Sequence, residues 1–283
     1  MRRLPRLVVL AIVPLVAGIF GLSLMAVAAP SVSAVESLSP GALLAASTPT
    51  VVTGTGSVGV SAAITAFRNL LGGPLNGVTP GQQPAGRREI NWDAAPITHT
   101  NTSTFPPAFF NTNSKRGAVF STPGSGFRVS DNNFSDVNAS YAGQFGFFSP
   151  LKTFAAIGSN VMEVRFQVAG STTPAMVSGF GVVFVDVDEI GTAFVEYFAG
   201  AHSLGAFVAP LHSGDSPLSF VGVHFGSPTV TRVRITSGHA ALGGAVADIT
   251  DDPWEGHDLV VMDDFLYGEP KAIKPVFLPT IVR

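Results

Sequence analysis

The chain has 283 residues, of which 46% are hydrophobic and only 12% are charged, and its mean hydropathy is +0.38. This composition supports a sizeable core and excludes a chain that is disordered over most of its length. The formal net charge of −3 argues against nucleic acid as a partner, and the absence of cysteine excludes a disulfide framework.

The first 34 residues have the pattern of an export signal. Arg2, Arg3 and Arg6 precede an uncharged stretch that runs from Leu7 to Ala29 and ends in small residues. This stretch is longer than the ~7–15 residues of most signal cores, so residues 1–34 are predicted to be a signal peptide or an uncleaved membrane anchor. We expect a secreted or cell-surface protein that meets a membrane only through such an anchor. Removal of the three arginines leaves 13 basic against 19 acidic residues, a net charge of −6.

Residues 35–85 are predicted to be a low-complexity linker that contains one short helix. The part from Val35 to Val60 is rich in Ala, Ser, Thr, Gly and Pro and has almost no charge. Apolar residues then recur at a spacing of three to four, which predicts a helix over about residues 62–71. Residues 271–283 are predicted to be a tail, either an extra strand, a surface-attachment signal or a loose end.

Residues 86–270 are predicted to form one antiparallel β-sandwich of jelly-roll type, an all-β fold. Met162 to Val168 alternates apolar with polar side chains, which is typical of a strand with one wet face. Further apolar runs are bounded by Gly, Pro, Ser or Asp, and no helical pattern separates them, which favours a sandwich over a parallel α/β sheet. These runs are Phe180–Val187, Phe194–Phe198, Leu204–Val208, Leu218–Phe225, Val230–Ile235 and Leu259–Tyr267.

Five motifs stand out in the chain: Gly86–Asp93 (GRREINWD), Asn113–Gly117, Gly179–Asp188, Arg232–Gly238 and Val260–Pro270 (VVMDDFLYGEP). With these motifs, the chain from about Phe67 to Pro270 resembles a family of uncharacterised secreted bacterial proteins. A glycine usually follows the Trp-Asp pair in that family, whereas this chain has Ala94. The second half also resembles the jelly-roll domains of exported, surface-anchored bacterial proteins, and this resemblance implies binding rather than catalysis.

The run Gly86–Asp93 carries four charges and one of the two tryptophans of the chain. In one interpretation it is a surface loop oriented by its ion pairs, with Trp92 in the core. In a second, Trp92 stacks on a sugar ring while Arg87 and Asp93 bind its hydroxyls. In a third, Glu89 or Asp93 is an oxygen ligand for calcium.

Eight of the 19 acidic residues lie in one C-terminal stretch that contains no Lys or Arg, a pattern that suits either a calcium site or a solvated acidic turn. Successive strand residues face opposite sides, so one of Asp263 and Asp264 is predicted to point inward and to need a partner. Because the first and last strands of such sandwiches often adjoin, we expect that partner in the run Gly86–Asp93. It is either calcium shared with Glu89 and Asp93, or an arginine. The eight acids are Asp248, Asp251, Asp252, Glu255, Asp258, Asp263, Asp264 and Glu269.

Asp186 and Asp188 stand two apart at the end of an apolar strand and are therefore predicted to share a face. Such a pair suits a cation or general acid and base catalysis, with Glu196 on the next strand as a third group. The alternative is a strand end that turns into solvent.

The sequence as a whole favours a non-catalytic binding or structural module with structural calcium and no other cofactor. Its expected partner is an extracellular polysaccharide or another cell-surface component. The alternative is an extracellular carbohydrate-active enzyme, a glycoside hydrolase or lyase, that uses the strand-end carboxylates.

Overall fold

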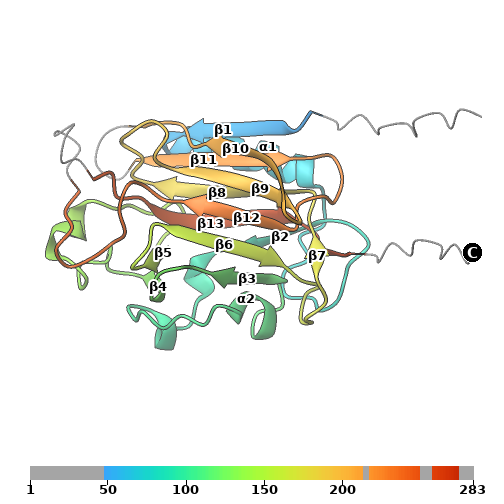
Figure 1. Ribbon diagram of the computed structural model, residues 1–283, viewed down its shortest axis with the longest axis horizontal. Helices are drawn as coiled ribbons and strands as arrows, with labels where there is room; N and C mark the ends of the chain where they lie inside the picture. The colour runs from blue at the N-terminus through green and yellow to red at the C-terminus, as the bar shows by residue number, and fades with distance from the viewer. Residues whose placement is uncertain (1–47, 213–216, 249–256, 274–283) are drawn as a thin grey trace, which may run out of the picture. The chain divides into compact units, whose positions relative to one another are not determined.

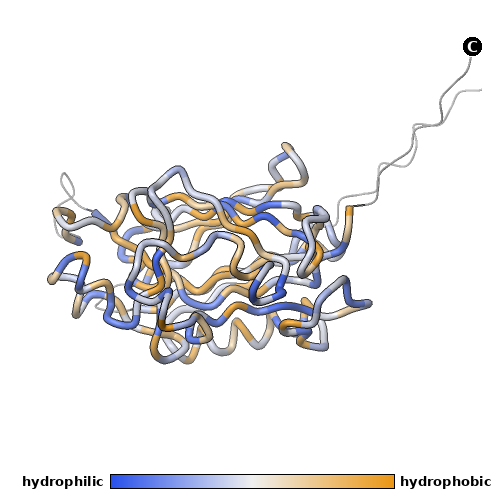
Figure 2. The backbone as a smooth tube through the Cα atoms, turned by 90° about the horizontal axis from the view of Figure 1, so that it is seen from below, coloured by the Kyte–Doolittle hydropathy of each residue, from blue (hydrophilic) through white to orange (hydrophobic). Residues whose placement is uncertain are grey.

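The computed structural model of the protein describes residues 48–212, 217–248 and 257–273. Two sheets lie face to face there, and all their strand pairs are antiparallel (Figure 1). Figure 2 shows them at right angles to that view, with hydrophobic stretches recurring along the backbone. The predicted fold class, an all-β antiparallel sandwich, is confirmed.

The larger sheet has seven strands in the order β1-β11-β8-β13-β5-β4, and β2 pairs with β13 off this path. Its central strands are apolar on both faces because both faces of the sheet are covered. The strands are β1 (Thr50–Thr55), β2 (Arg87–Ile90), β4 (Gly126–Ser130), β5 (Thr153–Ile157), β8 (Gly179–Val185), β11 (Leu218–His224) and β13 (Val261–Gly268).

The smaller sheet has five strands in the order β10-β9-β12-β6-β3, and β7 (Ala175–Met176) and β14 (Lys271–Ala272) form a separate pair. β6 buries alternate residues, as its period of two predicts. The outer face of this sheet carries polar and charged side chains. The strands are β3 (Ala118–Ser121), β6 (Val161–Phe166), β9 (Phe194–Ala199), β10 (His202–Val208) and β12 (Arg232–Thr236).

Two apolar cores hold these layers together. The first lies between the sheets and is rich in aromatic rings, with Trp92 stacked on Phe154 at a centroid distance of 3.7 Å. The second lies between the seven-stranded sheet and α1 (Gly56–Leu71), whose Phe67 meets Phe220 of β11 edge to face at 5.7 Å. In Figure 1, α1 lies behind the strands of that sheet.

The helix predicted within the linker is confirmed and ends at Leu71 as predicted, whereas the linker before it is wrong. Thr50–Thr55 form an edge strand along β11, and α1 begins at Gly56, about six residues before the predicted start. The uncharged Thr and Val residues of β1 suit an edge strand, but they do not alternate in the way that reveals one. A second, one-turn helix, α2 (Phe109–Thr112), was not predicted.

Short 3-10 turns complete the fold at η1 (Trp92–Ala94), η2 (Ile97–His99) and η3 (Ala139–Gly143). No helix among the described residues is both long and apolar enough to cross a membrane. The predicted signal or anchor over residues 1–34 lies outside the described part of the chain. Of the predicted tail, Lys271–Ala272 form β14 and residues 274–283 lie outside that part.

Candidate functional site

The run Gly86–Asp93 lies beside the last long strand, as predicted. β2 pairs antiparallel with β13, so that Ile90 is opposite Phe265 and Arg88 is opposite Tyr267. The arginine does not meet Asp263 or Asp264, because Arg88 forms a fully buried ion pair with Glu269 at 2.8 Å. β2 and the end of β13 are therefore joined by an arginine and a carboxylate, and this carboxylate was not the one predicted.

Glu89 is held by arginines. It accepts hydrogen bonds from Arg68 at 2.7 and 2.9 Å and from Arg87 at 2.7 Å. Burial raises the pKa of Glu89, but the hydrogen bonds from the two guanidinium groups outweigh it and leave the pKa below its ordinary value. A carboxylate neutralised in this way has no need of a cation.

Trp92 lies in the core and is not a sugar platform. Its indole is completely buried, stacked on Phe154 and edge to face with Phe110 and Phe265, and its Nε1 donates to the Asp263 carbonyl at 3.0 Å. A sugar needs an exposed aromatic face, so the predicted ligand site at Arg87, Trp92 and Asp93 is wrong on this point. The alternative interpretation is correct in placing Trp92 in the core, but the run that it took for a surface loop is strand β2.

The structure does not bring the predicted calcium ligands Glu89, Asp93, Asp263 and Asp264 together as a group. Among the described residues, the acidic group that meets the spacing of a metal site is a different one. The carbonyl of Asp93 accepts from Lys152 Nζ at 3.3 Å, and its backbone N–H donates to Asn91. Burial raises the pKa of the Asp93 carboxyl.

Asp263 and Asp264 are both buried, although only one was predicted to point inward. The register of β13 against β8 shifts between Met262 and Phe265, and this bulge breaks the alternation of faces. Asp263 accepts from the Phe148 backbone N–H at 2.8 Å. Burial and the neighbouring Asp263 raise the pKa of Asp264 to about 8.

The acidic group that the structure does assemble lies at the end of β8. One carboxylate oxygen from each of Asp186, Asp188 and Asp248 lies within 4.8 Å of the others. Asp186 and Asp188, predicted to share a face of the strand, do come together, although both lie just after β8 ends, and Asp248 joins them from the acid-rich C-terminal stretch. A buried carboxylate cluster that can hold a metal ion results.

The backbone of Asp186 is fixed where β8 ends. Its φ is +73°, a left-handed conformation in which aspartate is enriched, and its N–H donates to Pro217 at 2.8 Å. The side chain is fully buried, and Gln144 Nε2 donates to its Oδ2 at 2.5 Å and to Asp248 Oδ2 at 2.9 Å. The other oxygen, Oδ1, of both Asp186 and Asp248 is buried and has no hydrogen-bond partner within the described part of the chain.

The electrostatics of the cluster follow from its burial. Burial, together with the charges of Asp188 and Asp248, raises the pKa of Asp186 to about 9. Burial also raises the pKa of Asp248 to about 7, helped by Asp258 and Asp188. Asp258 accepts from the backbone of Asp188 at 3.3 Å and of Glu189 at 3.4 Å, which orders the turn after β8.

Glu196, predicted as a third group for catalysis, lies elsewhere. It is on the outer face of β9, where it pairs with Arg234 at 3.7 Å. Asp186 is fully buried, whereas a general acid for glycoside cleavage must reach the glycosidic oxygen. The geometry therefore gives no support to a carboxylate pair acting on a sugar.

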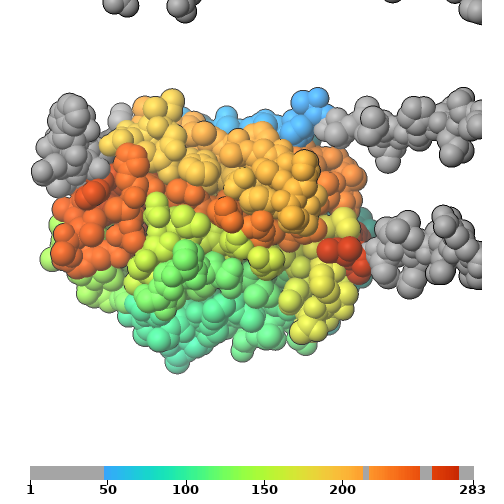
Figure 3. All heavy atoms as spheres, in the orientation of Figure 1, coloured from blue at the N-terminus to red at the C-terminus, as the bar shows by residue number. Residues whose placement is uncertain are grey.

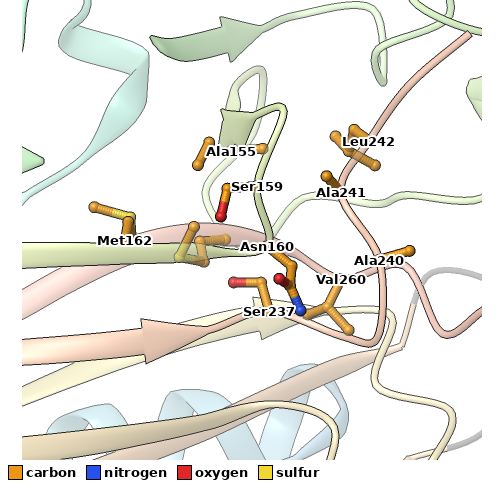
Figure 4. A pocket seen from close by; sticks show the side chains of 11 residues that line it. Ala155, Ser159, Asn160, Met162, Ser237, Ala240, Ala241, Leu242 and Val260 are labelled. Atoms are coloured by element: carbon orange, nitrogen blue, oxygen red, sulfur yellow. The ribbon is translucent and has the colours of Figure 1, made fainter. Parts of the chain in front are cut away.

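A small pocket opens near the ends of β5, β6 and β12 (Figure 4). Ser159, Asn160 and Ser237 line it together with small apolar side chains such as Ala155 and Ala241. Its volume of about 10 Å³ is enough for one water molecule and far too small for a sugar ring.

Comparison with known proteins adds no relative: no protein-family model, no curated protein and no solved structure matches this chain. The resemblance to secreted bacterial proteins therefore stays a prediction. Gln144 and Asp258 were not assigned to a site from the sequence, because nothing in the spacing of the chain indicates that these segments meet at the end of β8.

Proposed function

We propose that the protein is a non-catalytic, secreted or cell-surface β-sandwich module that binds a structural calcium ion at Asp186, Asp188 and Asp248. The observation that carries the proposal is a triad of carboxylates within 4.8 Å around the fully buried Asp186. Burying like charges side by side is costly, and a divalent cation offsets that cost.

The donor set favours calcium over other common metals. All three side chains offer oxygen, and the group contains no histidine or cysteine of the kind that zinc prefers. Calcium accepts six to eight oxygens in flexible geometry, whereas magnesium demands a near-ideal octahedron. Backbone carbonyls of the turn and water would complete the shell, while the Gln144 amide nitrogen donates to two of the carboxylates and orients them.

Such an ion would link the end of β8 to the segment that leads toward β13. Asp186 follows β8 directly, and Asp248 comes from the chain between β12 and β13. An exported chain without disulfides gains folding free energy from an ion of this kind, because the ion binds only the folded state.

Thermal unfolding at several calcium concentrations tests the proposal. Calcium at about ten times the dissociation constant is expected to stabilise the protein by about 1.4 kcal/mol, and EDTA to remove the effect. Asp248→Asn should abolish the response while raising the melting temperature in EDTA, because it removes a repelling charge. Asp131→Asn, which changes an exposed acid outside the cluster, is the matched control. A melting temperature that is unchanged by calcium in the unmodified protein refutes the site.

A further inference from the structure

The outer face of the five-stranded sheet carries a second concentration of charge, separate from the carboxylate cluster. Its charged residues lie in two rows, each running across the neighbouring strands β6, β12 and β9. Arg165 is opposite Arg232, and Arg232 is opposite Phe198; in the next row Arg234 lies between Glu163 and Glu196. We call these six residues the arginine face. Figure 3, in the orientation of Figure 1, shows the molecule from the side of this sheet.

The arginine face has more cations than its own acids neutralise. Glu163 pairs with Arg165 at 3.0 Å, with Arg234 at 3.1 Å and also with Arg232. Glu196 pairs with Arg234 at 3.7 Å and accepts a hydrogen bond from Ser203 Oγ at 3.1 Å. Three guanidinium groups against two carboxylates leave one positive charge on an otherwise acidic chain.

The arginines of this face differ in how they are held. Arg232 lies 3.7 Å above the ring of Phe198, which fixes it by a cation–π contact. Arg165 is 61% exposed and donates to Glu163 through Nη2, whereas Arg234 is 42% exposed and its Nε, Nη1 and Nη2 all lie against Glu163 or Glu196. Arg165 thus presents the more accessible guanidinium to an incoming anion, and Arg234, one row away on the neighbouring strand, would exchange a carboxylate partner for it.

Two open hollows flank the exposed arginines. One, of about 360 Å³, is lined by Arg165, Gln167 and Thr231 beside apolar residues, and the other, of about 510 Å³, by Arg234, Ser121 and Thr122 together with Glu163, the acid that Arg234 pairs with. Each combines an arginine with hydroxyl or amide groups, a set that suits a ligand with alternating carboxylates and hydroxyls. An extended polymer would occupy both hollows, whereas a single small ion would fill neither.

We propose that the arginine face binds a carboxylate-bearing polysaccharide, a chain of uronic acid units. The charge complementarity favours a polyanion, and the planar guanidinium fork matches a carboxylate in two parallel hydrogen bonds. An acidic peptide fits less well. β6 and β12 are paired on both sides and offer no edge for strand addition, and the ring of Phe198 is covered rather than presented as an anchor. This inference does not depend on the calcium site.

Isothermal titration of the full-length protein with short oligogalacturonates at low ionic strength tests this proposal. We expect binding that weakens as salt is added, and no binding of the fully methyl-esterified oligomers, which lack the charge. Arg165→Gln should raise the Kd by about tenfold, and the double variant Arg165→Gln, Arg234→Gln by more. Arg165→Lys, which keeps the charge and loses the fork, should fall between.

The matched control is Arg68→Gln, which removes one positive charge from α1 on the other side of the seven-stranded sheet. It should leave the Kd within about twofold of the starting value. Circular dichroism establishes that each variant is folded. The proposal is overturned by absence of binding, by equal losses in Arg68→Gln and Arg165→Gln, or by equally tight binding of poly-glutamate, which would indicate a general acidic-peptide surface.

Discussion

At the scale of single residues, the bulge in β13 creates a carboxyl pair that is costly to ionise. Asp263 and Asp264 are adjacent and buried, and Ser149 Oγ lies 2.8 and 3.1 Å from their Oδ1 atoms. The pKa of Asp263 is raised mainly by burial, and that of Asp264 is raised to about 8 by burial and by Asp263. Near neutral pH the folded pair therefore holds a proton that the unfolded chain has released.

This pair predicts a loss of stability with rising pH. An unfolded aspartate titrates near 3.9, so between pH ~4 and ~8 the folded state binds more protons and its unfolding free energy falls as the pH rises. Asp264→Asn, which can keep the Ser149 contact, should flatten this slope. It should be more stable than the unmodified protein at pH 8.5, by on the order of 1–3 kcal/mol.

Urea unfolding at pH 5 and pH 8.5 measures this difference. The comparison between variants cancels the contribution of Asp186 and Asp248, whose raised pKa values act in the same direction. Asp131→Asn, at an exposed acid, serves as the control. Equal pH slopes in Asp264→Asn and the unmodified protein would contradict the assignment of the proton to this pair.

The sequence predicted which kinds of side chain would pair, but not which acidic residue would be the partner. The sequence left calcium and an arginine, Arg87 or Arg88, as alternative partners for a buried acid of β13, and Arg88 does pair with an acid just past that strand. The acid is Glu269 because β2 and β13 are antiparallel, which places the residues after Gly268 beside the start of β2. Register is set by long-range packing, and one sequence does not reveal it.

At the scale of secondary-structure elements, the contact of α1 with the seven-stranded sheet depends on glycine. A Cβ on Gly222 of β11 would lie 2.9 Å from the Phe220 ring and 3.0 Å from that of Phe67, and one on Gly181 of β8 would meet the same two rings. The two glycines thus leave the space in which Phe67 meets the sheet. The three-to-four spacing predicted the buried face of the helix, but not the surface that receives it.

Gly222→Ala is therefore expected to destabilise the protein by about 1–3 kcal/mol, because the added methyl overpacks a filled site. Phe67→Ala should cost about 3–5 kcal/mol by leaving a cavity. In the Phe67→Ala background, Gly222→Ala should cost clearly less, since one of the two clashing rings is gone. Chemical denaturation of the four proteins measures the coupling. Gly143→Ala, at a position open to space, is the control, and additive losses at 222 and 67 would contradict the shared site.

At the scale of the whole molecule, the fold class followed from the spacing of apolar runs, whereas the domain boundary did not. A sandwich that begins at Gly86 omits β1 and α1, yet the second core buries Val60, Ile64 and Phe67 against the strands. Amphipathic helices are recognisable from their period, but whether one belongs to a core depends on the surface it covers. Low charge and small residues made Thr50–Thr55 resemble a linker, because an edge strand needs little hydrophobic pattern.

Because the folded domain includes β1 and α1 and does not begin at Gly86, we can predict how truncated chains behave. A chain that begins at Thr48 keeps β1 and α1 and should unfold cooperatively with the melting temperature of the full-length protein. A chain that begins at Gly86 exposes Phe220 and its neighbours on the outer face of the seven-stranded sheet, and it removes the partner strand of β11. We expect it to be aggregated or to melt without cooperativity, because an uncovered apolar face and a long free edge both promote association. Light scattering and calorimetry on the two chains distinguish these outcomes. A monomeric, cooperatively folded chain from Gly86 onward would mean that α1 is an accessory to the sandwich and not part of its core.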